Sequence, residues 1–478
     1  MKQIFFFFLL ILIVSKMLVL TSCANIIPPS GGPRDSLAPK TVALNPENNK
    51  MNFDAKRIVI SFNEFVEVKD LQTNLTVSPV PKQLPIIESK LRTVTIRLKD
   101  TLQSNTTYSI DFGKAIRDVN EGNILKNFTY TFSTGSYIDS MQFFGKVFLA
   151  STGKTDSSLI AMLYDDKDDS AVIKARPRYI VHLDSAGNFA FSHLKPDTYR
   201  LYALKDESGS RKYLSKSQLF AFADAPVEVK PNSAPVILYA YADTSTTGSG
   251  SSTTAKKQVK QPVQGAAPKK KEEEKVKRLQ FAVNLANAQL DLKTNLELVF
   301  SGPLKSFDSS KIRLTDEKFT EIPGTRFIED STRKKLTVLN KWTIDTKYHL
   351  IAAKDFAEDT MGYKLLKTDT LSFKTKSEAD YGSLRIRFTN LDLSKNPVLQ
   401  FVQSDAIKLS QPLTSRIFIE KLFVPGDYDL RILFDENKNG VWDPGEFFIK
   451  HRQPEKVLAI KKKLTVKANW DNETDYVL

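Results

Sequence analysis

A twelve-residue stretch near the C-terminus carries the side chains whose types and spacing most clearly predict chemistry. It runs from Asp435 to Glu446 and fits the pattern D-x-[DN]-x-[DN]-G-x5-E at every position. This pattern arranges oxygen atoms around a sharp glycine bend, and a hard cation such as Ca²⁺ prefers such a ring. The predicted ligands are Asp435, Asn437, Asn439, the backbone carbonyl of Val441, Asp443 and Glu446. One hypothesis is therefore a structural calcium ion, and the sequence predicts no other cofactor.

The same stretch also has a purely structural interpretation. Residues 428–434 and 447–450 on either side are strand-like, so the helices of an EF-hand are absent. In a hairpin loop, the Asn and Asp side chains would form Asx turns and Trp442 would cover the core. The corresponding loop of the first half, 206–211, lacks most of the ligands and contains Arg211. A metal ion is therefore not a general property of this fold, and both interpretations stay open.

Cys23 is the only cysteine in the 478 residues, so an intramolecular disulfide is excluded. Residues 4–14 form an unbroken apolar run, which is typical of a signal peptide and too short to span a bilayer. The residues 20–22 that precede the cysteine resemble the bacterial lipobox, although Lys16 departs from that pattern. The resemblance implies that residues 1–22 are a lipoprotein signal peptide. It also implies that Cys23 is acylated, for example with palmitate, and anchors the chain in a membrane.

The residues behind the cysteine bear on the choice of membrane. Residues 23–37 form a tether, and Pro and Gly between 28 and 33 disfavour both helix and strand. In the lipobox family, an aspartate directly after the cysteine retains the protein in the inner membrane, and Ala24 stands there instead. The start of the tether resembles lipoproteins of the Bacteroidota. In that family, export to the cell surface requires acidic residues close behind the cysteine. The first acidic residue is Asp35, so we expect the outer membrane, with the periplasmic face favoured over the cell surface.

Eight Asp-Ser or Asp-Thr triplets resemble the O-glycosylation acceptor of the Bacteroidota. The acceptor positions are Ser36, Thr101, Ser140, Ser170, Ser185, Ser331, Thr360 and Thr370. Asp followed by Ser or Thr is also ordinary turn chemistry, so glycosylation and turn formation stay equal alternatives.

No residue grouping in the sequence predicts catalysis. The four histidines are isolated within strand-like sequence, and no Ser/His/Asp grouping, Rossmann glycine pattern or P-loop is found. Without Lys2 and Lys16 of the predicted signal peptide, the formal charge of +14 falls to +12. Half of this charge, +6, lies between Lys256 and Arg278, where there are nine Lys or Arg and three Glu. The rest of the chain is only mildly basic and has no basic stripe with interleaved aromatic residues, so we expect no nucleic-acid partner.

Strand patterns position all these residues, and they occur twice in the same order. The residues 105–135 of the first half match 345–375 of the second, as strand, loop and a closing alternating strand. The residues 189–206 likewise match 417–435, as strand, Pro turn and strand. No helical pattern of useful length occurs outside the predicted signal peptide. The sequence thus predicts an all-β chain of tandem β-sandwiches in the order A-B-linker-A-B.

These modules are similar to two known families. The early strand 58–64 and the closing 131–135 of module A resemble the bacterial Ig-like domain of the S-layer type. The strand, Pro turn and Tyr-x-Leu of module B resemble the transthyretin-like or carboxypeptidase-regulatory-like sandwich. We name the modules A1 (38–136), B1 (140–242), A2 (279–377, more diverged) and B2 (382–478), joined by a basic linker (243–277) predicted to be disordered.

The sequence therefore predicts a non-enzymatic, outer-membrane-anchored lipoprotein that acts as a binding or scaffold module of the cell envelope. The alternative is a surface-exposed adhesin or glycan-binding lipoprotein. The membrane is the one partner that the residues specify, through Cys23. The envelope protein or glycan that the chain would bind is not specified.

Overall fold

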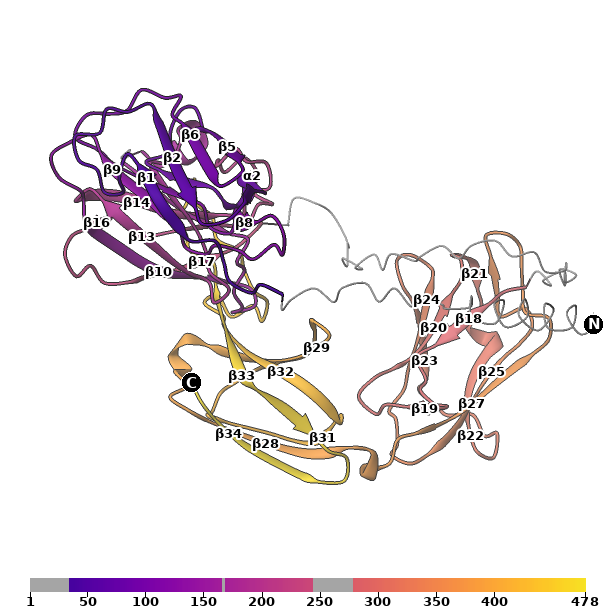
Figure 1. Cartoon of the computed structure of the whole chain (residues 1–478). Coiled ribbons are helices and arrows are strands. Elements are labelled where there is room, and N and C mark those ends of the chain that lie inside the picture. The colour runs from indigo at the N-terminus through magenta and orange to yellow at the C-terminus, as the bar shows by residue number, and fades with distance from the viewer. Residues whose placement is uncertain (1–33, 166–167, 244–277) are drawn as a thin grey trace, which may run out of the picture. The chain divides into compact units, whose positions relative to one another are not determined.

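The computed structural model describes residues 34–165, 168–243 and 278–478 (Figure 1). The predicted signal peptide, Cys23, most of the tether and nearly all of the linker lie outside the described residues. The described chain is built almost entirely from strands, as predicted, and its helical pieces are no longer than α2 (Leu71–Asn74) and α3 (Ala171–Lys174). Among these residues, no helix is both long and apolar enough to cross a membrane.

The described residues form two compact units. The first comprises the chain up to Lys146, Ser157–Tyr213 and Ala225–Ile237. The second comprises Val147–Asp156, Leu214–Asp224 and the chain from Leu238 to Leu478. Module A1 therefore lies in the first unit, whereas A2 and B2 lie in the second.

Module A1 has nine strands in three sheets. They are β1 (Thr41–Asn45), β2 (Arg57–Phe62), β3 (Val66–Val68), β4 (Thr76–Ser78), β5 (Ile86–Lys90), β6 (Thr93–Arg97), β7 (Thr107–Asp111), β8 (Ile116–Asp118) and β9 (Thr129–Ser133). The sheet orders are β1-β2-β6-β5, β4-β7-β9 and β3-β8.

Module A2 has the same strand order with one additional strand. Its strands are β18 (Phe281–Val283), β19 (Gln289–Leu290), β20 (Leu296–Phe300), β21 (Leu304–Phe307), β22 (Ile312–Asp316), β23 (Arg326–Glu329), β24 (Lys335–Leu339), β25 (Lys347–Ala352), β26 (Ala357–Asp359) and β27 (Asp369–Thr375). The sheet orders are β18-β20-β24-β23, β19-β27-β25-β22 and β21-β26. The extra β19 pairs in parallel with β27, where A1 has a single parallel bridge between Lys50 and Phe132.

Modules B1 and B2 repeat each other in the same way. The strands of B1 are β10 (Met141–Leu149), β11 (Ile160–Tyr164), β12 (Tyr179–His182), β13 (Asn188–Leu194), β14 (Asp197–Leu204), β15 (Phe220–Phe222), β16 (Val227–Val229) and β17 (Val236–Ala240). The strands of B2 are β28 (Gly382–Thr389), β29 (Pro397–Gln403), β30 (Ala406–Pro412), β31 (Ile417–Phe423), β32 (Gly426–Phe434), β33 (Lys456–Val466) and β34 (Asp471–Val477).

The sheets of B1 and B2 correspond strand by strand. One sheet has the order β13-β10-β17 in B1 and β31-β28-β34 in B2. The other has the order β12-β11-β14-β15, with β16 also beside β14, in B1 and β30-β29-β32-β33 in B2. The internal repeat that the sequence indicated is therefore a repeat of topology, and one long strand in B2 replaces two short ones in B1.

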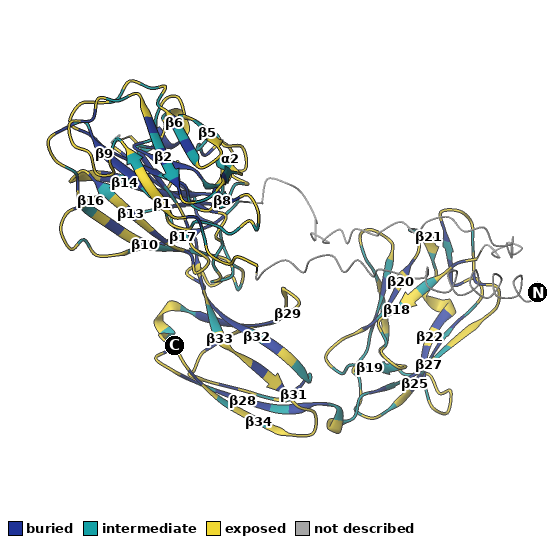
Figure 2. Ribbon diagram, viewed as in Figure 1, coloured by how far each residue is buried: buried dark blue, intermediate teal, exposed yellow. Residues whose placement is uncertain are grey.

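Alternating side chains form the core of each sandwich (Figure 2). In β2 the sequence Arg-Ile-Val-Ile-Ser-Phe buries Ile58, Ile60 and Phe62, because successive strand residues point to opposite faces. In β20 the pattern buries Leu296 and Phe300 in the same way. Burial of one such side chain stabilises the fold by roughly 2 kcal/mol.

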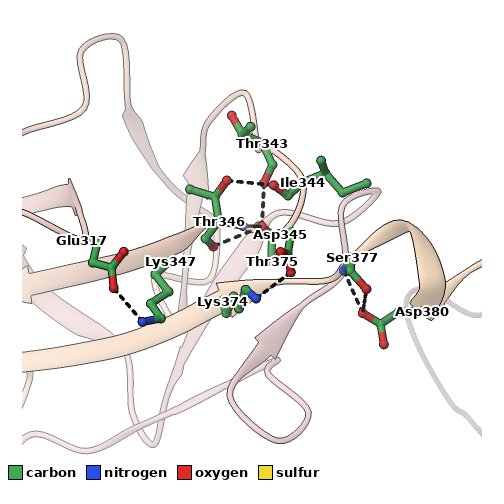
Figure 3. A network of polar contacts seen from close by, with 10 residues as sticks. All are labelled: Glu317, Thr343, Ile344, Asp345, Thr346, Lys347, Lys374, Thr375, Ser377 and Asp380. Atoms are coloured by element: carbon green, nitrogen blue, oxygen red, sulfur yellow. Dashed lines mark hydrogen bonds and ion pairs between the residues drawn. The ribbon is translucent and has the colours of Figure 1, made fainter.

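The turn before the central strand β25 of A2 is held by a network of hydroxyl groups (Figure 3). The Thr375 hydroxyl donates to the Thr343 carbonyl at 2.6 Å and accepts the backbone N–H of Thr346 at 2.9 Å. In A1, the Thr134 hydroxyl donates to the Gln103 carbonyl at 2.6 Å and accepts the N–H of Thr106 at 3.0 Å. The two copies thus share the polar bonds of this turn as well as strand order.

Candidate functional site

The predicted cation loop lies between β32 and β33 of B2. Its first residue, Asp435, is 2% exposed, and its carboxylate accepts the backbone N–H of Asn439 at 3.2 Å and of Gly440 at 2.7 Å. Gly440 has a φ of 77°, in the left-handed region that favours glycine, which explains why the pattern has glycine at this bend. Asp435 therefore closes the loop through backbone hydrogen bonds.

The other predicted ligands divide into two groups. The side-chain amides of Asn437 and Asn439 both donate to Asp443 Oδ2, at 2.6 and 2.8 Å. The amide oxygen of Asn437 accepts the N–H of Asn439, and that of Asn439 accepts the N–H of Val441, which are Asx turns. Glu446 instead pairs with Lys450 at 3.6 Å. Asn437 and Asn439 thus contact Asp443, and Asp435 binds the backbone of the loop. Glu446 does not join them, so the loop fits a cation only in part.

A carboxylate outside the twelve-residue pattern completes the loop. Glu455 is 2% exposed, and its two oxygens accept the N–H of Glu436 at 2.8 Å and of Asp443 at 3.0 Å. Burial raises the pKa of Glu455, the two backbone donors lower it, and the charges of Asp435 and Asp443 raise it further. The sequence offered no reason to single out Glu455, because it follows the pattern at a distance. In the described part of the chain, no group of three or more His, Cys, Asp or Glu side chains is placed to hold a metal ion.

The corresponding loop of B1 uses its first aspartate in the same way. The Asp206 carboxylate accepts the N–H of Arg211, five residues on, at 2.9 Å, just as Asp435 accepts that of Gly440. The hairpin interpretation of the loop is therefore observed in both copies. Calcium binding by the B2 loop stays a prediction.

The residues after the pattern pack against aromatic side chains within the second unit. The Phe447 ring lies 5.1 Å from that of Phe220 and 4.9 Å from that of Phe222, and all three are at most 3% exposed. The Gln453 side-chain amide donates to the Phe222 carbonyl at 3.0 Å and to Asp224 at 2.8 Å. The longer loop of B2 thus contributes a buried aromatic residue as well as polar turns.

The predicted glycosylation residues lie mostly on exposed turns. Seven of the eight are exposed, Ser170 is half-buried, and Thr370 is the one within a strand. Several of the preceding aspartates act as turn acceptors; Asp184, for example, accepts the N–H of Ala186 and Asn188. Asp330 and Asp359 do the same for backbone groups that follow them. Turn formation is therefore observed, and glycosylation stays a prediction.

The histidines make structural contacts. His349 shares a 2.8 Å hydrogen bond with the Ser372 hydroxyl and stacks on Phe319 at 4.6 Å. His451 lies 4.8 Å from the Phe222 ring. Burial lowers the pKa of His182 and of His193.

A cleft of about 440 Å³ lies in the first unit, between A1 and the β11–β12 end of B1. It is bordered by residues 77–85 and 98–103 of A1 and by 176–178 of B1. Its volume is in the range of small-molecule sites. The sequence analysis missed this cleft because its walls come from three separate segments that show no shared pattern.

Comparison with known proteins identifies one part of the chain. Residues 35–134 match the family of bacterial Ig-like domains. Module A1 is a bacterial Ig-like domain. The strand order of A2 repeats that of this Ig-like domain. No comparison addresses the resemblance of B1 and B2 to transthyretin-like sandwiches, which stays a prediction. A search of curated protein sequences found no match.

Several solved structures are similar to parts of the chain at low identity. Native alpha-2-macroglobulin from Escherichia coli is 15% identical over 38% of this chain and 72% of that chain, with a TM-score of 0.20. The TIE protein of Bacillus anthracis is 10% identical over 94% and 75%, with a TM-score of 0.17. The N-terminal part of the bacterial S-layer protein SbsC is 17% identical over 43% and 44%, with a TM-score of 0.15.

Proposed function

We propose that the chain is a non-enzymatic lipoprotein that is anchored in the outer membrane through acylated Cys23 and serves as a binding or scaffold module of the cell envelope. The observation that carries the proposal is the repeated pair of β-sandwich modules behind the lipobox-like sequence.

The anchor is tested by metabolic labelling with a fatty-acid analogue. The wild-type chain should take up the label and fractionate with the outer membrane. Cys23→Ser should lose both properties. Label retained on the Cys23→Ser chain, or a wild-type chain without label, would contradict the proposal.

The periplasmic face is the proposed location, and a surface-exposed adhesin or glycan-binding protein is the alternative. The resemblance to Bacteroidota lipoproteins supports the periplasmic face, because no acidic residue stands between Cys23 and Asp35. Protease treatment of intact cells separates the two, since the basic linker between Lys256 and Arg278 offers many trypsin sites. Cleavage there only after lysis supports the periplasm, and cleavage on intact cells supports the alternative.

We also propose a calcium ion in the B2 loop, and this part of the proposal is independent of the anchor and of the membrane face. The fit of residues 435–446 to the twelve-residue pattern supports it. The donation of the Asn437 and Asn439 amides to Asp443 and the pairing of Glu446 with Lys450 do not. Thermal unfolding is compared in calcium and in chelator. Stabilisation by calcium that disappears in Asn437→Ala would support the ion. Equal melting temperatures in calcium and chelator would remove it.

A further inference from the structure

The cleft between A1 and B1 has an apolar floor. Val77, Ile110 and Phe132 line it and are each at most 5% exposed, and the Tyr108 ring lies beside them. Leu98 and Leu102 line it and are partly buried. Binding of an apolar group in this space would be favoured by a free energy of about 25 cal/mol per Å² of apolar surface that it buries.

The walls of the cleft are held in place before any ligand arrives. Four prolines line it, Pro79, Pro81, Pro85 and Pro177, and each fixes its own backbone torsion. The backbone N–H of Val80 donates to the Arg178 carbonyl at 2.7 Å, which joins A1 to B1. The Lys82 N–H donates to the Asp100 carboxylate at 2.5 Å, which joins the two A1 segments. Such a site loses little conformational entropy when it binds.

The charges at the rim do not balance. The Arg178 guanidinium is paired with Asp165 at 3.0 Å, and the Arg176 guanidinium donates to the Lys82 carbonyl at 2.7 Å. Lys82 and Lys99 both line the cleft and are exposed. Among the described residues, neither lysine side chain forms an ion pair. Four cationic side chains therefore line the cleft, those of Lys82, Lys99, Arg176 and Arg178, against the two carboxylates of Asp100 and Asp165, which leaves an excess of two positive charges.

We propose that this cleft binds a small amphiphile with an apolar body and an anionic head group, of the fatty-acid class. The body lies over Val77, Leu98 and Ile110, and the carboxylate lies at the rim, where the lining cations outnumber the carboxylates of Asp100 and Asp165. Charge complementarity selects an anion over a neutral or cationic amphiphile. The inference rests on the binding role proposed above and needs neither the anchor nor a particular membrane face.

Binding is measured by titration calorimetry with sodium dodecanoate, below its micelle concentration. The protein is the processed chain carrying Cys23→Ser, which lacks the acyl group and keeps all four modules. Dodecan-1-ol serves as the neutral probe. We expect saturable binding of dodecanoate and about tenfold weaker binding of the alcohol, because the head group loses its ionic contacts.

Two variants locate the site. The double variant Lys82→Glu/Lys99→Glu should weaken dodecanoate binding about tenfold or more. The double variant Lys90→Glu/Lys126→Glu is the matched control, because it changes the net charge of A1 equally at exposed positions that do not line the cleft. The control should bind as the parent chain does.

A third variant tests the apolar floor. Val80→Trp places a large ring in the cleft from a half-buried position and should abolish binding while the circular dichroism of the chain is preserved. The proposal is overturned if the parent chain shows no saturable binding, if both charge variants bind equally, or if Val80→Trp binds normally. None of these results bears on the proposed anchor, which the labelling experiment tests separately.

Discussion

Modules A1 and A2 differ in sequence more than in structure, and comparing them shows which features the fold needs. In A1 the Tyr108 hydroxyl accepts the N–H of Gln103 at 2.8 Å, and in A2 the Tyr348 hydroxyl accepts that of Thr343 at 3.1 Å. The second turn residue in each copy, Asn105 or Asp345, has a positive φ. Strand order and the buried polar bonds of the turns are thus kept, because an unpaired buried polar group would cost about 1 to 3 kcal/mol.

The two B modules agree in the same way and differ in their loops. The Tyr199 hydroxyl donates to the Lys195 carbonyl at 2.8 Å, and the Tyr428 hydroxyl donates to the Val424 carbonyl at 2.9 Å. These bonds explain the Pro turn followed by Tyr-x-Leu that identified the repeat. The loop after β32 is longer than the loop after β14, and it alone carries the cation-like pattern and Phe447. This loop is thus one place where B1 and B2 differ although their strand order is the same.

The largest expected effect is a loss of stability when the aromatic residue found only in the loop after β32 is removed. Phe447→Ala removes an aromatic ring that is 3% exposed and packs on Phe220 and Phe222. We expect the free energy of unfolding of the full chain to fall by about 3 kcal/mol, which is the usual cost of such a cavity. Urea unfolding measures it. Phe448→Ala, at a 47% exposed neighbour, is the control and should change stability far less. Equal effects of the two substitutions would contradict the buried role of Phe447.

The next largest effect is the stability lost when an aspartate that closes a loop is replaced. One such aspartate closes the loop after β8 and another closes the loop after β26. Asp118, 1% exposed, accepts the N–H groups of Glu121, Gly122 and Asn123, whereas Asp359 accepts those of Met361 and Tyr363. Asp118→Ala should cost about 2 kcal/mol, and Asp359→Ala should cost less because fewer donors lose their acceptor. Hydrogen exchange of the two loops measures both. A larger effect at Asp359 would show that the number of donors does not govern the cost.

A smaller effect tests whether the Pro turns are equivalent. Tyr199→Phe and Tyr428→Phe each remove one hydroxyl and leave a carbonyl without its donor. Each should lower the free energy of unfolding by about 1 kcal/mol, and the two values should be similar. Differential scanning calorimetry of the two single variants measures them. Clearly unequal values would mean that the repeated motif has different roles in B1 and B2.

The smallest effect is a dependence on pH. Burial by itself would raise the pKa of Asp118, but its three backbone donors lower the pKa below the usual value of 3.8. Because the folded-state pKa is the lower one, the stabilisation is present above the unfolded pKa and is lost as the pH falls through the folded pKa. The stability difference between wild type and Asp118→Asn should therefore shrink under strongly acidic conditions. A difference that stays constant as the solution is acidified would rule out this linkage.

Much of the fold follows from local sequence. The alternation of residues 128, 130 and 132 predicted the closing strand of A1, which is β9, where Tyr130 and Phe132 are buried. The matched turn sequences predicted the repeat, because each turn requires particular residues for its hydrogen bonds. The acidic loop was also located correctly from its glycine and Asx residues. Glu455, the carboxylate that binds the backbone of this loop, was not predicted from the sequence.

What the sequence determined by itself is the alternation of strands, the repeat of two modules and the chemistry of the turns, all of which depend on neighbours along the chain. Only the tertiary structure decided that Glu455 closes the loop of Asp435, that Phe447 is buried, and that 77–85, 98–103 and 176–178 enclose a cleft. These features join residues that are distant in sequence. They depend on how whole strands and loops pack, and no local pattern records that packing.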